Sequence, residues 1–151
     1  MLYAAYDIDG NHFLDNVDVG GITLIDQFSD HSLEYLLGLL NSRLLKWFFP
    51  FVSAPFRGGW LSANKQFLSQ LPIRPINFDD PADRDRHDRM VALVERMLSL
   101  HRELAAAREP HQRTALQRQI DATDARIDAL VYELYDLTDD EIAVVEGEGR
   151  N

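Results

Sequence analysis

Hydrophobic residues follow two different spacings in the first part of this chain of 151 residues. In residues 12–28, β-branched and aromatic side chains partly alternate with polar ones around a Gly-Gly pair, which is typical of short strands joined by a turn or bulge. From residue 32 to residue 49, leucines and phenylalanines recur every three or four positions, which predicts a helix. Ser32 or Asp30 can cap its start, and Pro50 and Pro55 are expected to end it.

The stretch "FRGGWLSANKQFLSQLPIRP", residues 56–75, predicts a turn at Gly58-Gly59, a short strand and a brief helix at residues 64–70. The Leu-Pro-Ile-Arg-Pro-Ile run that follows is expected to be extended, since residues before proline avoid the helical region. Residues 1–78 therefore predict a small mixed domain of the α+β class.

From Asp79 onward the pattern is helical, with Asp80 as a candidate N-cap and Pro81 at the favoured first helical position. Apolar positions then alternate spacings of four and three in two runs separated by Pro110, as along a coiled-coil seam. The first seam is Met90, Val94, Met97, His101 and Leu104, and the second is Leu116, Ile120, Thr123, Ile127, Leu130 and Leu134. We expect a long antiparallel, coiled-coil-like helical hairpin at residues 79–136, with arms of about 35–40 Å.

The C-terminal segment, residues 137–151, begins with Thr138 and Glu141 at the spacing of a capping box. It predicts a short helix that Gly147 can close, followed by a tail. The expected fold is therefore α+β, with a mixed domain at 1–78, the hairpin at 79–136 and a short C-terminal helix at 137–151.

The distribution of charge changes this picture more than the formal net charge of −10 does. Residues 1–34 carry a net charge of −7 and residues 79–151 a net charge of −8, whereas residues 35–78 contain five bases and no acid. Such segregation favours a local anion-binding face. A window without acids around a buried helix can also arise by chance, and that alternative stays open.

Composition indicates a cytoplasmic location. The chain has no cysteine, which fits a reducing compartment, and its first residues lack the features of a signal peptide. Its longest apolar stretch is interrupted by Lys46 and Pro50 and is too short to span a bilayer, so no membrane partner is expected.

Catalytic and metal-binding patterns are weak. Asp7, Asp9 and Asn11 alternate as in a calcium loop, but His12 and Asp18 stand where an EF-hand requires glycine and glutamate. The five histidines form no ligand pair at useful spacing, and the paired aspartates precede helix starts, where they complement the helix dipole. We therefore predict no catalytic residue, metal site or cofactor site in this chain.

The basic segment is the remaining candidate site. Arg and Lys neutralise phosphates, while Asn, Gln and Arg can read base edges in the major groove of DNA. A surface turn whose tryptophan fills a core pocket is the competing interpretation, and chemistry alone leaves both open. The candidate DNA contacts are Arg43, Arg57 and Lys65 for phosphates, Asn64, Gln66 and Trp60 for bases or grooves, and Lys46 and Arg74 on the same basic face.

Three stretches of the sequence resemble a known family. "SLEYLLGLLNSRLLKWFF", "FRGGWLSANKQFLSQLPI" and "IDALVYELYDLTDDEIAVVEG" are similar to the C-terminal target-recognition region of TaqI-like DNA adenine methyltransferases and of restriction enzymes that fuse such a methyltransferase to a nuclease. Type I restriction specificity subunits are similar in layout. The resemblance covers roughly residues 6–76 and 127–147.

The resemblance implies a target-recognition (specificity) domain rather than a complete enzyme. In that family a separate catalytic domain binds S-adenosylmethionine and carries an Asn-Pro-Pro-Tyr motif, and this sequence has neither that motif nor a Gly-rich cofactor loop. The expected partners are double-stranded DNA, bound weakly by this chain alone, and a catalytic methyltransferase or nuclease domain in the same polypeptide or complex. The alternative is a coiled-coil interaction module that forms a homodimer through the hairpin and makes no DNA contact.

Overall fold

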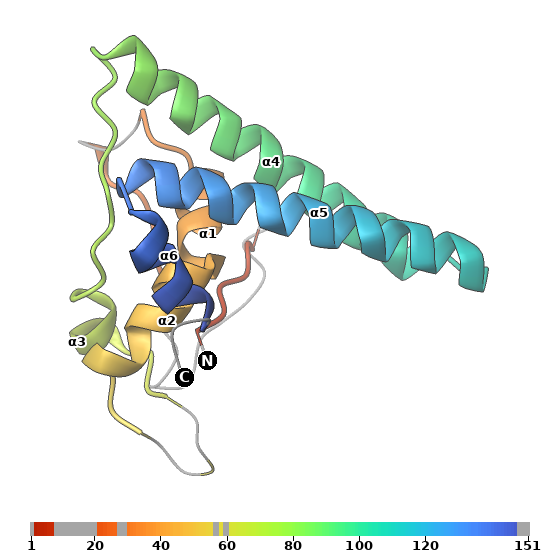
Figure 1. Ribbon diagram of the computed structural model, residues 1–151, viewed down its shortest axis with the longest axis horizontal. Coiled ribbons are helices and arrows are strands. Elements are labelled where there is room, and N and C mark those ends of the chain that lie inside the picture. Colours follow the sequence, from red (N-terminus) through yellow and green to blue (C-terminus); the bar gives the residue numbers. More distant parts are fainter. Residues whose placement is uncertain (1, 8–20, 27–29, 56–57, 59–60, 148–151) are drawn as a thin grey trace.

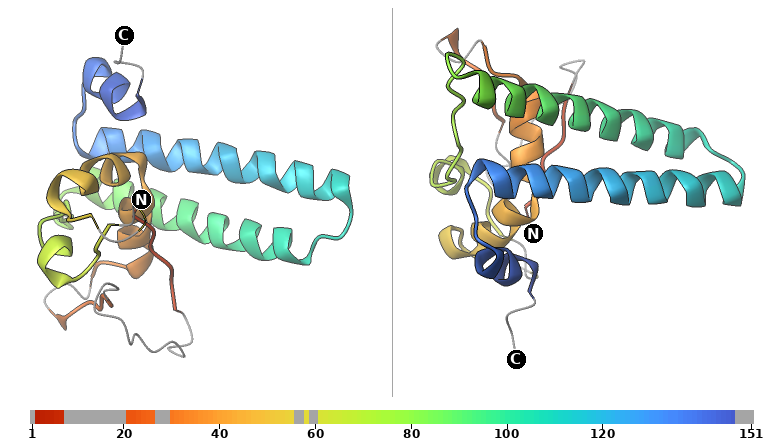
Figure 2. Two further views of the ribbon diagram at one scale, coloured as in Figure 1. Left: turned by 90° about the horizontal axis from the view of Figure 1, so that it is seen from below. Right: turned by 45° about the horizontal axis from the view of Figure 1, so that its top comes forward.

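The computed structural model describes residues 2–7, 21–26, 30–55, 58 and 61–147. Helices α4 and α5 lie side by side, and the far half of this hairpin extends beyond the rest of the molecule (Figure 1). The other helices gather at the opposite end, as both views in Figure 2 show. Within the described ranges the helices are α1 (Leu33–Asn41), α2 (Arg43–Val52), α3 (Lys65–Leu68), α4 (Pro81–Ala106), α5 (Pro110–Leu134) and α6 (Asp139–Glu146).

The predicted α+β class is wrong, because the described residues form helices and no sheet. Strand-type pairing in the described residues is limited to isolated bridges, such as the antiparallel bridge between Pro55 and Leu61. Residues 21–26 belong to the predicted strand region and contain no strand, while residues 12–20 and 27–28 of that region lie outside the described part.

Residues 72–77 are extended, as predicted, but they have no partner strand. Two prolines in this stretch lack N–H groups, and side chains from just before α1 and from α4 bind other backbone groups instead. The Ile76 N–H donates to His31 Nε2 (3.1 Å), and the Asn77 N–H donates to Asp83 Oδ2 (3.1 Å). Side chains thus supply the hydrogen-bond partners that neighbouring strands would supply in a mixed domain.

The single helix predicted over residues 32–49 is two helices that meet at Ser42. The Ser42 hydroxyl donates to the Leu39 carbonyl (2.6 Å) and accepts from the Leu45 N–H (3.3 Å). One buried hydroxyl therefore ends α1 and caps α2. Pro50 lies inside α2, which continues to Val52, so the expectation that this proline ends the helix is also wrong.

The main core lies where α1 and α2 pack against the hairpin. Helix α1 contacts α4, and α2 contacts α5 and α6. Gly38 allows α1 to approach closely, because a Cβ atom there would lie 2.5 Å from Met90 Sδ. The core side chains with the least exposure include Tyr35, Leu39, Leu45, Phe49, Met90, Val94, Leu130, Val131 and Leu134.

The two seams differ in how well the sequence predicted them. All six residues of the second seam, from Leu116 to Leu134, are buried, as expected. In the first seam Met90 and Val94 are buried, but His101 is exposed and Leu100 is fully buried instead. The C-terminal prediction is confirmed: α6 begins with a capping box between Thr138 and Glu141 and ends at Gly147.

Candidate nucleic-acid interface

Residues 35–78, hereafter the acid-free segment, contain most of α1, all of α2 and α3, and the extended stretch 72–77. In Figure 1 this segment lies at the end of the molecule opposite the tip of the hairpin. Its cations have different surroundings, and those surroundings decide which of them could reach a phosphate.

Arg43, at the start of α2, is held by two carboxylates. Its Nε lies 3.2 Å from Asp128 Oδ2, its Nη1 lies 3.4 Å from Glu146 Oε1, and its backbone N–H donates to Asp128 Oδ1 (2.8 Å). Burial raises the pKa of Asp128, and the hydrogen bond from the Arg43 N–H opposes that rise. Arg43 thus joins α2 to α5 and α6, although its side chain is still 54% exposed.

Arg74, in the extended stretch, forms a two-pronged ion pair with Asp83 of α4. The Nη1–Oδ2 distance is 3.0 Å and the Nη2–Oδ1 distance is 2.9 Å. The hydrogen bonds from Arg74 and from the Asn77 N–H lower the pKa of Asp83 to about 2. Arg74 therefore fixes residues 72–77 to the start of α4.

Lys46 and Lys65 make no ion pair within the described part of the chain. Lys46 Nζ lies 5.4 Å from the centre of the Tyr3 ring, a cation–π contact. Lys65 and Gln66 are exposed on the short helix α3. Asn64 caps that helix: its Oδ1 accepts from the Gln66 N–H (3.1 Å), and its amide donates to Ser62 Oγ (3.2 Å).

The remaining two candidates, Arg57 and Trp60, lie outside the described residues. Asn64, Lys65 and Arg74 line one apolar groove of about 1130 Å³ between α1, α3 and residues 21–25. Arg43 and Lys46 are not part of its lining. The structure thus brings three of the candidates together and places two others on α2.

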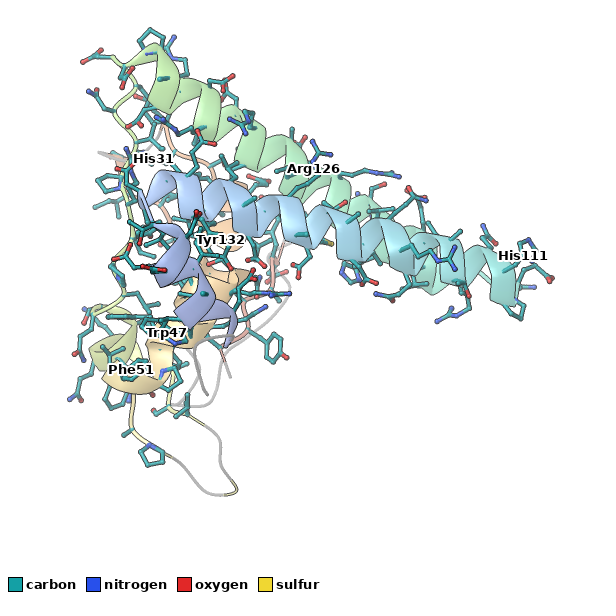
Figure 3. All side chains as sticks on the ribbon, viewed as in Figure 1. His31, Trp47, Phe51, His111, Arg126 and Tyr132 are labelled. Atoms are coloured by element: carbon teal, nitrogen blue, oxygen red, sulfur yellow. The ribbon has the colours of Figure 1, made fainter. Side chains whose placement is uncertain are left out.

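Several residues at this end of the molecule were not singled out from the sequence. Trp47 and Phe51 are exposed on α2, with ring centres 5.0 Å apart (Figure 3). In the sequence Asp83 and Asp128 look like any acidic residue of a predicted helix. Nothing near them marks them as partners of Arg74 and Arg43. Only the packing of the hairpin on α1 and α2 reveals those pairs.

Among the described residues, no three histidine or acidic side chains converge in a way that could hold a metal ion. None of the described helices combines the length and the apolar character needed to cross a bilayer.

A curated protein is similar to almost the whole chain. The type II restriction enzyme and methyltransferase RM.Eco57I of Escherichia coli is 26% identical over 151 residues, which is 97% of this chain. The chain spans about 15% of the length of that relative. No family model and no solved structure matches the chain. The chain is therefore a distant relative of one part of a restriction–modification enzyme.

Proposed function

We propose that this chain is a DNA target-recognition module of a restriction–modification enzyme, and that its acid-free segment faces duplex DNA. The observation that carries the proposal is the match of 97% of the chain to part of a restriction enzyme and methyltransferase. Methyl transfer, with bound S-adenosylmethionine, and any DNA cleavage would take place in a catalytic part outside this sequence. The role of this chain is to position duplex DNA for that part.

The ion pairs divide the candidate cations into two groups. Arg43 and Arg74 are neutralised by carboxylates of α4, α5 and α6, so they attach the acid-free segment to the hairpin. Lys46 and Lys65 form no ion pair with a described carboxylate, although the charge of Lys46 acts on Asp128, and their ammonium groups can approach phosphates. Gln66, next to Lys65 and exposed, is the described side chain best suited to reach a base edge.

Binding by this chain alone is expected to be weak. Its net charge of −10 repels DNA at long range, and two of its five local bases are already paired with acids. The expected Kd is no tighter than the non-specific range of roughly 10⁻⁴–10⁻⁶ M at physiological salt. In the complete enzyme the catalytic part would supply further contacts on the other side of the duplex.

The test compares the double variant Lys46→Ala/Lys65→Ala with Arg102→Ala/Arg108→Ala, which removes the same charge from exposed positions of the hairpin and its connection. Fluorescence anisotropy with labelled duplex DNA measures log K against log salt for each protein. Each lost phosphate contact flattens that slope by about 0.9, so the lysine variant should lose about 1.8. The arginine variant should keep the wild-type slope.

Equal slopes for both variants would show that Lys46 and Lys65 do not contact the DNA. Nanomolar, sequence-selective binding by the isolated chain would contradict the expected weakness. A thermal melt of each variant checks that the loss of the Lys46–Tyr3 contact has not unfolded the protein.

Dimerisation through the hairpin, the alternative function, receives no support from the described surface. Apart from His101, which is exposed, the seam residues of α4 and α5 are turned toward each other and toward α1 and α2. The exposed large hydrophobic side chains in the described ranges all lie outside α4 and α5: Tyr3, Ile22, Ile25, Trp47, Phe51, Ile73 and Val144.

A further inference from the structure

Two histidine rings meet two other aromatic rings where α1, α4 and the end of the extended stretch come together. The His31 ring centre lies 6.3 Å from that of His87 and 5.0 Å from that of Phe78. The His87 ring centre lies 5.3 Å from that of Tyr35 and 5.0 Å from that of Phe78. His87 is only 6% exposed, and Figure 3 labels His31 at this end of the molecule.

Each histidine accepts a backbone hydrogen bond on its Nε2 atom. The Ser32 N–H donates to His87 Nε2 (3.3 Å), and the Ile76 N–H donates to His31 Nε2 (3.1 Å). An Nε2 atom can accept only while it carries no proton, so each of these hydrogen bonds requires an unprotonated Nε2 atom. His87 Nδ1 lies 3.0 Å from Asp88 Oδ1, which fits donation from that nitrogen.

The surroundings of His31 disfavour a positive charge on its ring. His31 directly precedes Ser32, the N-cap of α1, so its ring lies near the positive end of the helix dipole. Burial and the neighbouring His87 lower the pKa of His31, and Asp30 partly opposes them. The charged and titratable groups on the surrounding elements are Asp30 ahead of α1, Glu34 and Tyr35 on α1, Arg74 in the extended stretch, and Asp83, Arg84, Arg86 and Asp88 on α4.

We propose that His31 is a pH-sensitive latch, which holds the backbone at Ile76 beside the start of α1 and releases it when the His31 ring is protonated. Protonation replaces the Nε2 lone pair with an N–H group, so a donor would face the Ile76 N–H donor. The Arg74–Asp83 ion pair keeps residues 72–77 attached to α4, so the opening is local to Ile76. Because His31 and residues 73–75 line the apolar groove, this opening loosens one wall of that groove.

The sign of the pH dependence follows from the lowered pKa of His31. A histidine that is harder to protonate in the folded state stabilises that state fully above its unfolded pKa of about 6.5. That contribution is lost as the pH falls from about 6.5 through the lower pKa of the folded ring. The latch is therefore closed at neutral pH and opens in mildly acidic solution.

Amide hydrogen exchange measured by NMR on the intact chain tests the latch. We expect the protection factor of the Ile76 amide to fall about tenfold between pH 7 and pH 5, which corresponds to roughly one bound proton per opening. The amide of Ile120, in the middle of α5, serves as the internal reference and should change much less. Parallel changes at Ile76 and Ile120 would overturn the proposal.

A variant pair separates the latch from general acid destabilisation. In His31→Gln/His87→Gln the side-chain oxygen can accept the same backbone hydrogen bonds at any pH, so the loss of protection at Ile76 should disappear. His101→Gln/His111→Gln removes two exposed histidines of the hairpin and should behave as wild type. If the first variant does not fold, the exchange data on the wild-type chain still decide. If the Ile76 amide lost the same protection in the wild type and in His31→Gln/His87→Gln, the latch would be refuted.

Discussion

Asp83 provides the sharpest test of how the extended stretch is attached to the hairpin. Its carboxylate accepts hydrogen bonds from Arg74 (3.0 and 2.9 Å), Arg86 (3.3 Å) and the Asn77 N–H (3.1 Å). Replacement by asparagine keeps the shape but removes the charge and half of the acceptor capacity. Asp83→Asn should therefore weaken the attachment of residues 72–77 to α4.

The pKa of Asp83 sets the size of the effect. A fall from 3.8 to about 2 corresponds to at most about 2.5 kcal/mol of stability at neutral pH. Arg74 and Arg86 are 30% and 28% exposed, so water screens part of this interaction. We expect Asp83→Asn to lower the free energy of unfolding by about 1–2 kcal/mol, measured by urea denaturation with circular dichroism.

The pH dependence gives a second readout. Because the pKa of Asp83 is lowered in the folded state, its contribution is present above about 3.8 and is lost as the pH falls toward 2. The matched control is Asp85→Asn, whose side chain is 67% exposed and lies 3.6 Å from Arg89. This control should cost less than about 0.5 kcal/mol. Equal losses for the two variants at neutral pH would refute the reasoning.

Two further substitutions test the packing of α1 and the start of α6. Gly38→Ala gains about 1 kcal/mol of helix propensity but would bring a Cβ atom to 2.5 Å from Met90 Sδ and 3.0 Å from Val94 Cγ2, so a net loss of about 1–2 kcal/mol in urea denaturation is expected. A gain would show that α1 and α4 are not packed this closely. Thr138→Ala removes the capping box with Glu141 and should cost about 1 kcal/mol, whereas Thr138→Ser should restore most of it; equal stability of the two variants would contradict the role of the hydroxyl.

The long helices were predictable because their signals are local. Pro81 and Pro110 mark the first turns of α4 and α5, and all six residues of the second seam are buried, at positions where α5 packs against α4 and α2. The prediction of the first seam is wrong at His101 because of how the helices pack. The early turns of α4 pack against both α1 and α5, whereas the later turns pack only against α5, so the buried face rotates toward Leu100.

The mixed domain could not be predicted correctly, because an extended proline-rich stretch has the same local pattern with or without a sheet. Its partners are single side chains from distant parts of the chain, such as His31 and Tyr135, whose hydroxyl donates to the Pro72 carbonyl. The pairing of Arg43 with Asp128 spans 85 positions of sequence and has no local signal either. Sequence therefore located the basic segment and left open which of its charges are neutralised.

The most direct test of DNA recognition is an NMR titration of the isotope-labelled chain with duplex DNA at low salt. The account predicts that amide shifts change mainly on α2 and α3, around Lys46, Lys65 and Gln66, and that the tip of the hairpin near Pro110 is unaffected. No shift changes at DNA concentrations up to the millimolar range, or changes concentrated on the hairpin, would contradict the claim that the acid-free segment faces DNA.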